Sequence, residues 1–313
     1  MFTVSRHTSR YAVVVLLALA GLIALPAAQA NALDEIKSCF SFLNAQNYAR
    51  AEQTAQALLR RNDLDRSVQR YANLCLGKAL VDTGRISDAL PVFLRAEALS
   101  QSTKELAVAY NWLGPTYESL NDLDHAELYD QRAIKANREL GDRGGEATAL
   151  NNLATVVEKR GDVDRALTLY QEALSIEPDE AKKPSTLNNI ALIYSSRKDY
   201  LRATAMLRQA IEIDRRNGDG HGVAMHQINL GGLLIDAKQY VKAEKELLAG
   251  LNAIRLVGDK HGEAEGCSIM GNLAFSRKNK TLAREWYEKA EALYREIGDT
   301  NNADQIANLL SGK

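Results

Sequence analysis

The chain has 313 residues, and its 39 Lys and Arg residues nearly balance its 40 Asp and Glu residues. Proteins that bind nucleic acids or anionic membranes through charge carry a basic excess, so this balance argues against both classes. Hydrophobic residues make up 46% of the chain and aromatic residues only 6%, a composition poor in strand formers. We therefore expect a globular, all-α protein.

The first thirty residues have the order of a secretory signal peptide. Arg6 and Arg10 precede an apolar run over residues 11–25, and the small residues Ala28 and Ala30 follow it. A membrane-spanning helix needs roughly 20 apolar residues, which is more than this run provides. We expect cleavage after residue 30, a periplasmic or secreted bacterial product and no membrane insertion of the mature chain. Retention of the segment as a membrane anchor is the alternative.

A repeat of 37 to 40 residues runs through the rest of the chain. It is marked by one column of alanines, by a column of mostly small residues twelve positions earlier, and by a third column seven positions later. The alanine column is Ala51, Ala89, Ala126, Ala166, Ala203, Ala243 and Ala283. The earlier column is Cys39, Gly77, Gly114, Ala154, Ala191, Gly231 and Gly271. Small side chains let two helix axes approach to about 8–10 Å, so each repeat is interpreted as a pair of closely packed helices.

Turn residues stand at two places in each repeat. Asn121-Asp122 and Lys198-Asp199 are examples of the turns expected between the two helices of a pair. Gly141-Asp142 and Gly258-Asp259 are examples of those expected between one pair and the next. Glycine there is expected to end the second helix in a left-handed conformation.

Residues 32–298 resemble the tetratricopeptide repeat family. The resemblance rests on stretches such as Trp112-Leu113-Gly114 followed by Ala126 and Ala133, and Asn152-Leu153-Ala154 followed by Gly161-Asp162, Ala166, Tyr170 and Ala173. The longer repeats are similar to the roughly 40-residue subtype of that family. The resemblance implies a right-handed superhelical solenoid of about seven helix pairs over residues 31–299.

Two further local features follow from the sequence. Residues 300–311 have the pattern of one more amphipathic helix, with Ile306, Leu309 and Leu310 on one side. We expect this C-terminal segment, residues 300–313, to cap the end of the repeat array. Pro115 lies inside the expected first helix of the third repeat and should kink it.

Three cysteines, Cys39, Cys75 and Cys267, are too few to build a disulfide-dependent fold. Cys39 and Cys75 are expected on the first helices of adjacent repeats. We interpret them as two small buried side chains, and a disulfide between them is the alternative that an oxidising compartment would allow.

No motif in the sequence indicates catalysis, a cofactor or a metal. Residues 218–222 are rich in glycine but lack the Lys-Ser/Thr pair of a phosphate-binding loop. His221 and His261 are interpreted as solvated loop histidines, and His226 is spaced so that it points away from His221. We expect a non-catalytic protein without a cofactor.

The first helix of each pair lines the concave surface in solenoids of this kind. Side chains three positions before the small-residue column, and one, four or five after it, are then expected to face a groove. Asn111, Asn151 and Asn188 hold the first of these positions in three consecutive repeats. An asparagine amide can bond both backbone groups of an extended peptide, and members of the subtype that hold peptides use asparagines in this way. For the adjacent Asn152, Asn189 and Asn229 we prefer a bond to the neighbouring helix.

The remaining groove positions differ along the chain. Polar residues in the middle are Glu118, Thr155, Glu158 and Ser195, and apolar residues at the two ends are Phe40, Leu43, Leu74, Val81, Ile235 and Phe275. Such a surface suits an extended segment with apolar anchors and a basic residue near the two glutamates. Only Lys78 and Lys159 are basic at these positions, so the family's carboxylate clamp is not expected.

Two hypotheses of function follow from the sequence. The first is an exported scaffold or adaptor that binds a peptide or protein segment in its groove, without nucleic acid. The alternative is a structural element that self-associates or docks on a cell-envelope complex through its edges and ends.

Overall fold

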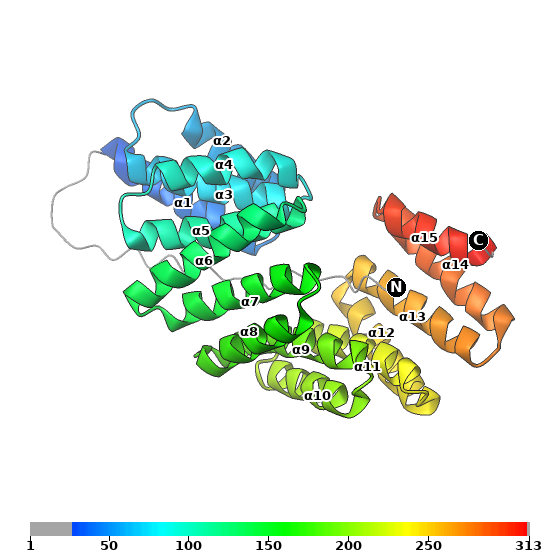
Figure 1. Cartoon of the computed structure of the whole chain (residues 1–313). Helices are drawn as coiled ribbons and strands as arrows, with labels where there is room; N and C mark the ends of the chain where they lie inside the picture. Colours follow the sequence, from blue (N-terminus) through cyan, green and yellow to red (C-terminus); the bar gives the residue numbers. More distant parts are fainter. Residues whose placement is uncertain (1–26, 312–313) are drawn as a thin grey trace. The chain divides into compact units, whose positions relative to one another are not determined.

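The computed structural model describes residues 27–311 of the chain, which form fifteen α-helices, one 3₁₀ turn and no strand (Figure 1). They divide into two compact units, with the division between Pro178 and Asp179. The helices of the first unit are α1 (Ala27–Asn44), α2 (Tyr48–Leu59), α3 (Arg66–Asp82), α4 (Ile86–Ala98), α5 (Thr103–Ser119), α6 (Leu123–Leu140), α7 (Arg143–Lys159) and α8 (Val163–Ile176). The second unit contains η1 (Glu180–Lys182), α9 (Lys183–Ser196), α10 (Tyr200–Arg216), α11 (Gly220–Asp236), α12 (Tyr240–Val257), α13 (Lys260–Ser276), α14 (Lys280–Glu296) and α15 (Thr300–Ser311).

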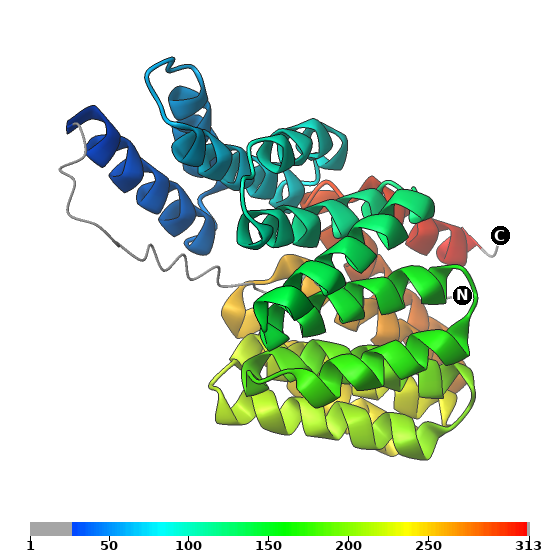
Figure 2. The ribbon, with the colours of Figure 1, turned by 60° about the vertical axis from the view of Figure 1, so that its left-hand side comes forward.

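Within each unit, successive helices pack side by side as antiparallel pairs, for example α5 with α6 and α11 with α12 (Figures 1 and 2). The columns of small residues form the contacts between paired helices, as the sequence predicts. All seven alanines of the central column are buried. The residues of the earlier column are buried as well. At its glycines, a larger side chain would overlap side chains of the facing helix, so the position needs a small residue.

Both kinds of turn have the predicted chemistry. Asn121 and Gly141 adopt positive φ angles of 62° and 67°, and each stands where a helix ends. Asp122 and Asp142 then accept hydrogen bonds from backbone N–H groups three residues later, at 3.2 Å and 2.9 Å. These carboxylates satisfy donors that the first turn of a helix leaves without an intrahelical partner.

The division between the two units follows from a local change in the sequence. Helix α8 ends at Ile176, and Glu177 adopts an extended conformation before Pro178. Proline disfavours helical geometry in the residue before it, so α8 cannot continue as the second helices of later repeats do. The sequence predicts one continuous array, and continuity across the two units stays a prediction. The right-handed superhelix stays a prediction.

Two further local predictions can be compared with the structure. Helix α5 continues through Pro115 as one element, and a kink there stays a prediction. Helix α15 packs against α14 and buries Ala303 and Ile306, whereas Leu309 is exposed and does not share their contact. Of the segment predicted to be a signal peptide, residues 1–26, which include the whole apolar run, lie outside the described residues. No helix among residues 27–311 is long and apolar enough to span a membrane.

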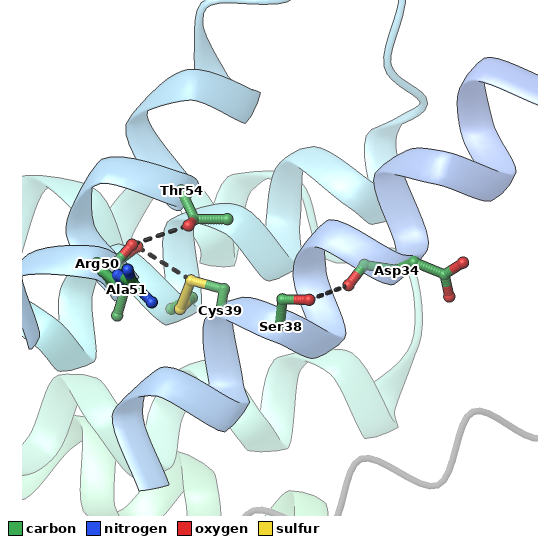
Figure 3. Close-up of a disulfide and its surroundings, with 7 residues drawn as sticks. Asp34, Ser38, Cys39, Arg50, Ala51 and Thr54 are labelled. Carbon is green, nitrogen blue, oxygen red and sulfur yellow. Dashed lines mark hydrogen bonds between the residues drawn. A yellow bond between two sulfur atoms is a disulfide. The ribbon is translucent and has the colours of Figure 1, made fainter. Parts of the chain in front are cut away.

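Cys39 on α1 and Cys75 on α3 form a disulfide bond (Figure 3). Their Cα atoms are 6.4 Å apart, within the distance that a disulfide can bridge. The interpretation of two separate buried thiols is therefore wrong. Close packing of α1 on α3 brings the two side chains together, a geometry that sequence spacing alone does not establish.

Candidate binding surface

The side chains that the sequence assigned to a groove lie on the first helices of the pairs, and we call the set the first-helix surface. In the first unit it comprises Asn111 and Glu118 on α5 and Asn151, Thr155 and Glu158 on α7. In the second unit it comprises Asn188 and Ser195 on α9.

An ion pair connects α5 to α7 across the first-helix surface. The Lys159 ammonium contacts the Glu118 carboxylate and lies 3.4 Å from the Glu118 carbonyl oxygen. Lys78, the other basic residue at these positions, forms an ion pair of 2.8 Å with Asp82 on its own helix. Both lysines therefore already have carboxylate partners within the chain.

Tyr170 of α8 joins two of the predicted residues into a polar network. Its hydroxyl is 2.9 Å from the Thr155 hydroxyl and donates to the Glu158 carboxylate at 3.1 Å. The ring is fully buried, so the hydroxyl reaches this surface from between the helices. Sequence reasoning did not assign Tyr170 to the site. Its position in the sequence could have indicated this role, because it lies four residues after Ala166, where the side chain faces the small-residue column of the first helix.

Asn111 carries an unsatisfied polar atom. Its amide oxygen is buried and has no hydrogen-bond partner among the described residues. Asn151, one repeat later, is half-buried and lies one helical turn before Thr155. Leaving a buried acceptor unpaired costs about 1–3 kcal/mol, so packing within the chain does not account for Asn111.

Asn188 has a different environment in the second unit. Its amide oxygen accepts a hydrogen bond of 2.9 Å from the Asn229 side chain on α11. Asn229 thus bonds the neighbouring helix, as we preferred for its column, and its partner is a residue that we had assigned to the groove. Ser195 is half-buried on the same helix as Asn188. The row of three asparagines therefore has unlike members.

The apolar ends predicted for the groove are mostly core. Leu43 and Leu74 are buried in one cluster with the disulfide, and Phe40 and Val81 pack against it. Ile235 is buried too, and among these six residues only Phe275 is exposed, at 62%. The prediction of apolar anchors at both ends is wrong for the buried residues, because neighbouring helices cover positions that the spacing alone assigns to a surface.

His221 and His226 lie in specific contacts rather than in solvent. His221 is 2.9 Å from the Asp259 carboxylate, and His226 is 2.7 Å from that of Asp214. These pairs link helices, so the interpretation of His221 as a solvated loop residue is wrong. Within residues 27–311, no three His, Cys, Asp or Glu side chains are grouped so as to hold a metal.

A buried thiol and a surface depression are two further features of the molecule. Burial raises the pKa of the Cys267 thiol to about 11, so the thiol is protonated at neutral pH and is a poor nucleophile. An open depression of about 560 Å³ lies at the α5–α6 turn, lined in part by Asp122, Asp124 and Arg160. Arg160 donates to Asp124 there at 2.5 Å, so these charges already pair with each other.

Comparisons with solved structures show the same fold at low sequence identity. The apo form of the quorum sensor NprR from B. thuringiensis has a TM-score of 0.64 at 12% identity, covering 90% of this chain and 86% of that one. A tetratricopeptide repeat protein from Parabacteroides merdae has a TM-score of 0.59 at 14% identity, covering 89% and 100%. A Rap protein complexed with competence and sporulation factor has a TM-score of 0.56 at 12% identity, covering 91% and 98%.

Sequence comparisons identify the family. No curated protein matches the chain. Two family models, both described as tetratricopeptide repeat, match residues 105–179, 145–216 and 183–255 and residues 41–104. The matches together span residues 41–255, which is more than half of the chain. The protein therefore belongs to the tetratricopeptide repeat family.

Proposed function

We propose that this protein is an exported, non-catalytic scaffold that binds an extended peptide or protein segment on its first-helix surface. The observation that carries the proposal is the buried amide oxygen of Asn111, which lacks a hydrogen-bond partner. Because this oxygen is covered in the unbound conformation, the half-buried side chain would have to rotate for a backbone N–H of a bound segment to satisfy it. The fold supports a protein partner, since one similar structure is a quorum sensor and another is a Rap protein complexed with competence and sporulation factor.

The first unit offers the better surface for such a segment. Asn111 and Asn151 are one repeat apart and present amides that can both donate and accept. The Thr155, Glu158 and Tyr170 network lies beside Asn151 and is held in place by the buried tyrosine ring. A segment that bonds these groups through its backbone needs no particular side chains. The second unit is a separate surface, on which Asn188 would bond a segment through its amide N–H because its oxygen accepts from Asn229.

Replacing Asn111 or Asn151 with alanine should weaken partner binding about fivefold, because one hydrogen bond contributes roughly 1 kcal/mol. The double change should weaken binding about 25-fold if the two contacts are independent. Binding is to be measured by calorimetry with the partner recovered by crosslinking from the native periplasm. The melting temperature of Asn111→Ala should stay within a degree or two of the parent protein, because the Asn111 amide oxygen has no partner within the described residues to lose.

Two control variants separate a binding role from a structural one. Asn152→Ala changes the adjacent asparagine and should leave affinity unchanged. Ala166→Leu overpacks the α7–α8 pair, where Ala166 is fully buried, and should lower stability by about 1–3 kcal/mol. If the Asn111 and Asn151 variants bind as tightly as the parent, or melt as low as Ala166→Leu, the two asparagines are structural and the proposal fails.

Self-association is the second candidate function, and exposed apolar side chains favour it. In the second unit Leu201 is 84% exposed, Val241 is 78% exposed and Leu256 is 90% exposed. Leu201 and Val241 hold the same position in successive repeats, so they recur along one edge. Sedimentation at increasing concentration tests this function, and a protein that stays monomeric at high concentration argues against it.

The export part of the proposal is supported by the order of residues 1–30 and by the disulfide. Disulfides persist in oxidising compartments and are rare in the cytosol. Cleavage after residue 30 would retain Ala32, Ile36 and Cys39, three buried side chains of α1. We place the mature protein in the periplasm or outside the cell.

N-terminal sequencing of protein from the envelope fraction should therefore begin at Asn31, because Ala28 and Ala30 fit the small-residue cleavage site. Recovery of most molecules with an intact Met1 would instead establish the anchor.

A further inference from the structure

Asp130 is a buried acid in a column of otherwise apolar side chains. It stands on α6, four residues after Ala126, and is 0% exposed. Neither carboxylate oxygen has a hydrogen-bond partner among the described residues. The same position in the other repeats is held by Ala55, Phe93, Tyr170, Leu207, Leu247 and Tyr287. Nothing in the packing pattern calls for an acid here.

The surroundings of Asp130 leave it no room to move toward α5. A Cβ placed on Gly114 would lie 2.8 Å from the Asp130 Cγ, so the carboxyl group rests directly against the α5 backbone. Other repeats pack a glycine of the first helix against an aromatic ring of the second, as Gly77 against Phe93 and Gly271 against Tyr287. In the α5–α6 pair the equivalent contact is Gly114 against the Asp130 carboxyl group. The acid is thus part of the α5–α6 contact itself.

The charged groups around Asp130 are also acids. Glu118 of α5 and Glu127 of α6 act on it electrostatically. Glu118 forms an ion pair with Lys159 of α7. Glu127 forms ion pairs with Arg165 of α8 at 3.2 Å and with Arg160, which follows α7, at 3.5 Å. The three basic groups therefore contact the two glutamates, and no hydrogen bond from a basic group reaches Asp130.

We propose that Asp130 is a protonation switch in the α5–α6 pair, which is closed while the acid is neutral and loosened once it ionises. Burying a neutral carboxyl group in this apolar contact costs only its hydrogen bonds to water. Burying a carboxylate costs much more, because it is an unpaired negative charge near the carboxylates of Glu118 and Glu127. Ionisation therefore favours conformations in which α6 separates from α5 and exposes Asp130 to water. Helix α5 carries Asn111 and Glu118, so the same motion would disturb the first-helix surface of this unit.

The direction of the pH effect follows from the two states. Burial, with Glu118 and Glu127 as smaller causes, raises the pKa of Asp130 well above its ordinary value in the folded chain. In the unfolded chain its pKa is about 3.9, the ordinary value for aspartate. Between these two pKa values the folded state keeps a proton that the unfolded state has lost, so stability falls as pH rises. The stabilising contribution is complete below the unfolded pKa and is lost by the time pH passes the folded one.

The test uses the full mature chain and needs no ligand, so its outcome does not depend on the proposed function. The carboxyl carbon of Asp130 is followed by NMR as a function of pH, with Asp130→Asn to assign the signal. In parallel, hydrogen exchange of α5 and α6 amides is measured in both proteins from pH 4 upward and corrected for intrinsic exchange. The α13–α14 pair is the internal control, because Tyr287 holds the equivalent position there.

We expect the carboxyl signal to titrate well above the pH range of an ordinary aspartate. The opening constant of the α5–α6 pair should rise up to tenfold per pH unit relative to Asp130→Asn, the slope that one proton gives. Opening of α13–α14 should be the same in both proteins. Titration near pH 4, or equal pH dependence of α5–α6 opening in parent and variant, would overturn the proposal. If Asp130→Asn does not fold, Asp130→Leu replaces it, since leucine occupies this position in two other repeats.

Discussion

Removal of the disulfide by the double change Cys39→Ala and Cys75→Ala should lower the free energy of unfolding of the first unit by about 4 kcal/mol. The bond closes a loop of 36 residues that includes all of α2, and the loss of loop entropy in the unfolded chain gives an effect of that size. Alanine at residue 39 matches Ala154 and Ala191, which hold the same column position and are buried. Most of the loss should therefore come from the missing cross-link rather than from a cavity.

Urea unfolding with and without a reducing agent measures this effect. The parent protein should lose stability in reductant, whereas the double variant should have the same urea midpoint of unfolding with and without reductant. Cys267 is the matched control, because Cys267→Ala removes a thiol that is buried and unbridged and should leave the response to reductant intact. Three titratable thiols in the unfolded, unreduced parent protein would contradict the bond.

The fold could be predicted because its main constraint is local and repeats. Each pair of helices needs small side chains at fixed spacing, and a column such as Ala126, Ala166 and Ala203 is visible in the sequence without knowledge of any contact. Turn positions are equally local, since Asp122 and Asp142 need only the backbone N–H groups that follow them. The extended backbone of Glu177 before Pro178 was not predicted, because it depends on how one repeat ends, which a search for the common pattern leaves out.

The binding surface was harder to predict because exposure depends on neighbours. Leu43 and Leu74 have the spacing of groove residues but lie in the core beside the disulfide. Asn188 has the spacing of Asn111 but bonds Asn229 on the next helix. In each case the residue type and the register were read correctly, and the packing of the adjacent helix decided whether the side chain was free to meet a partner. Asp130 is the converse case, since its departure from an apolar column is visible in the sequence and its consequence is visible only in the structure.

The packing column can be tested at two adjacent glycines of α11. Gly231 belongs to the small-residue column, and a Cβ there would lie 2.6 Å from Leu247 Cδ2 and still closer to its Cγ. Leu247 is fully buried, so its branched carbon cannot withdraw without displacing the core. Gly231→Ala should therefore lower the free energy of unfolding of the second unit by about 1–3 kcal/mol, the usual effect of overpacking.

Gly232 supplies the control from the same helical turn. A Cβ on Gly232 would meet its nearest atoms, in Ile269, at 3.7 Å, an ordinary contact distance. Alanine also stabilises a helix interior over glycine by roughly 0.5–1 kcal/mol, so Gly232→Ala should raise stability by that amount. The two changes are chemically identical and one residue apart, so their opposite signs in urea unfolding would isolate the helix–helix contact from helix propensity. If both variants were stabilised, α11 and α12 would not pack as closely as the column requires, and close helix packing would not explain why small residues recur at this position in every repeat.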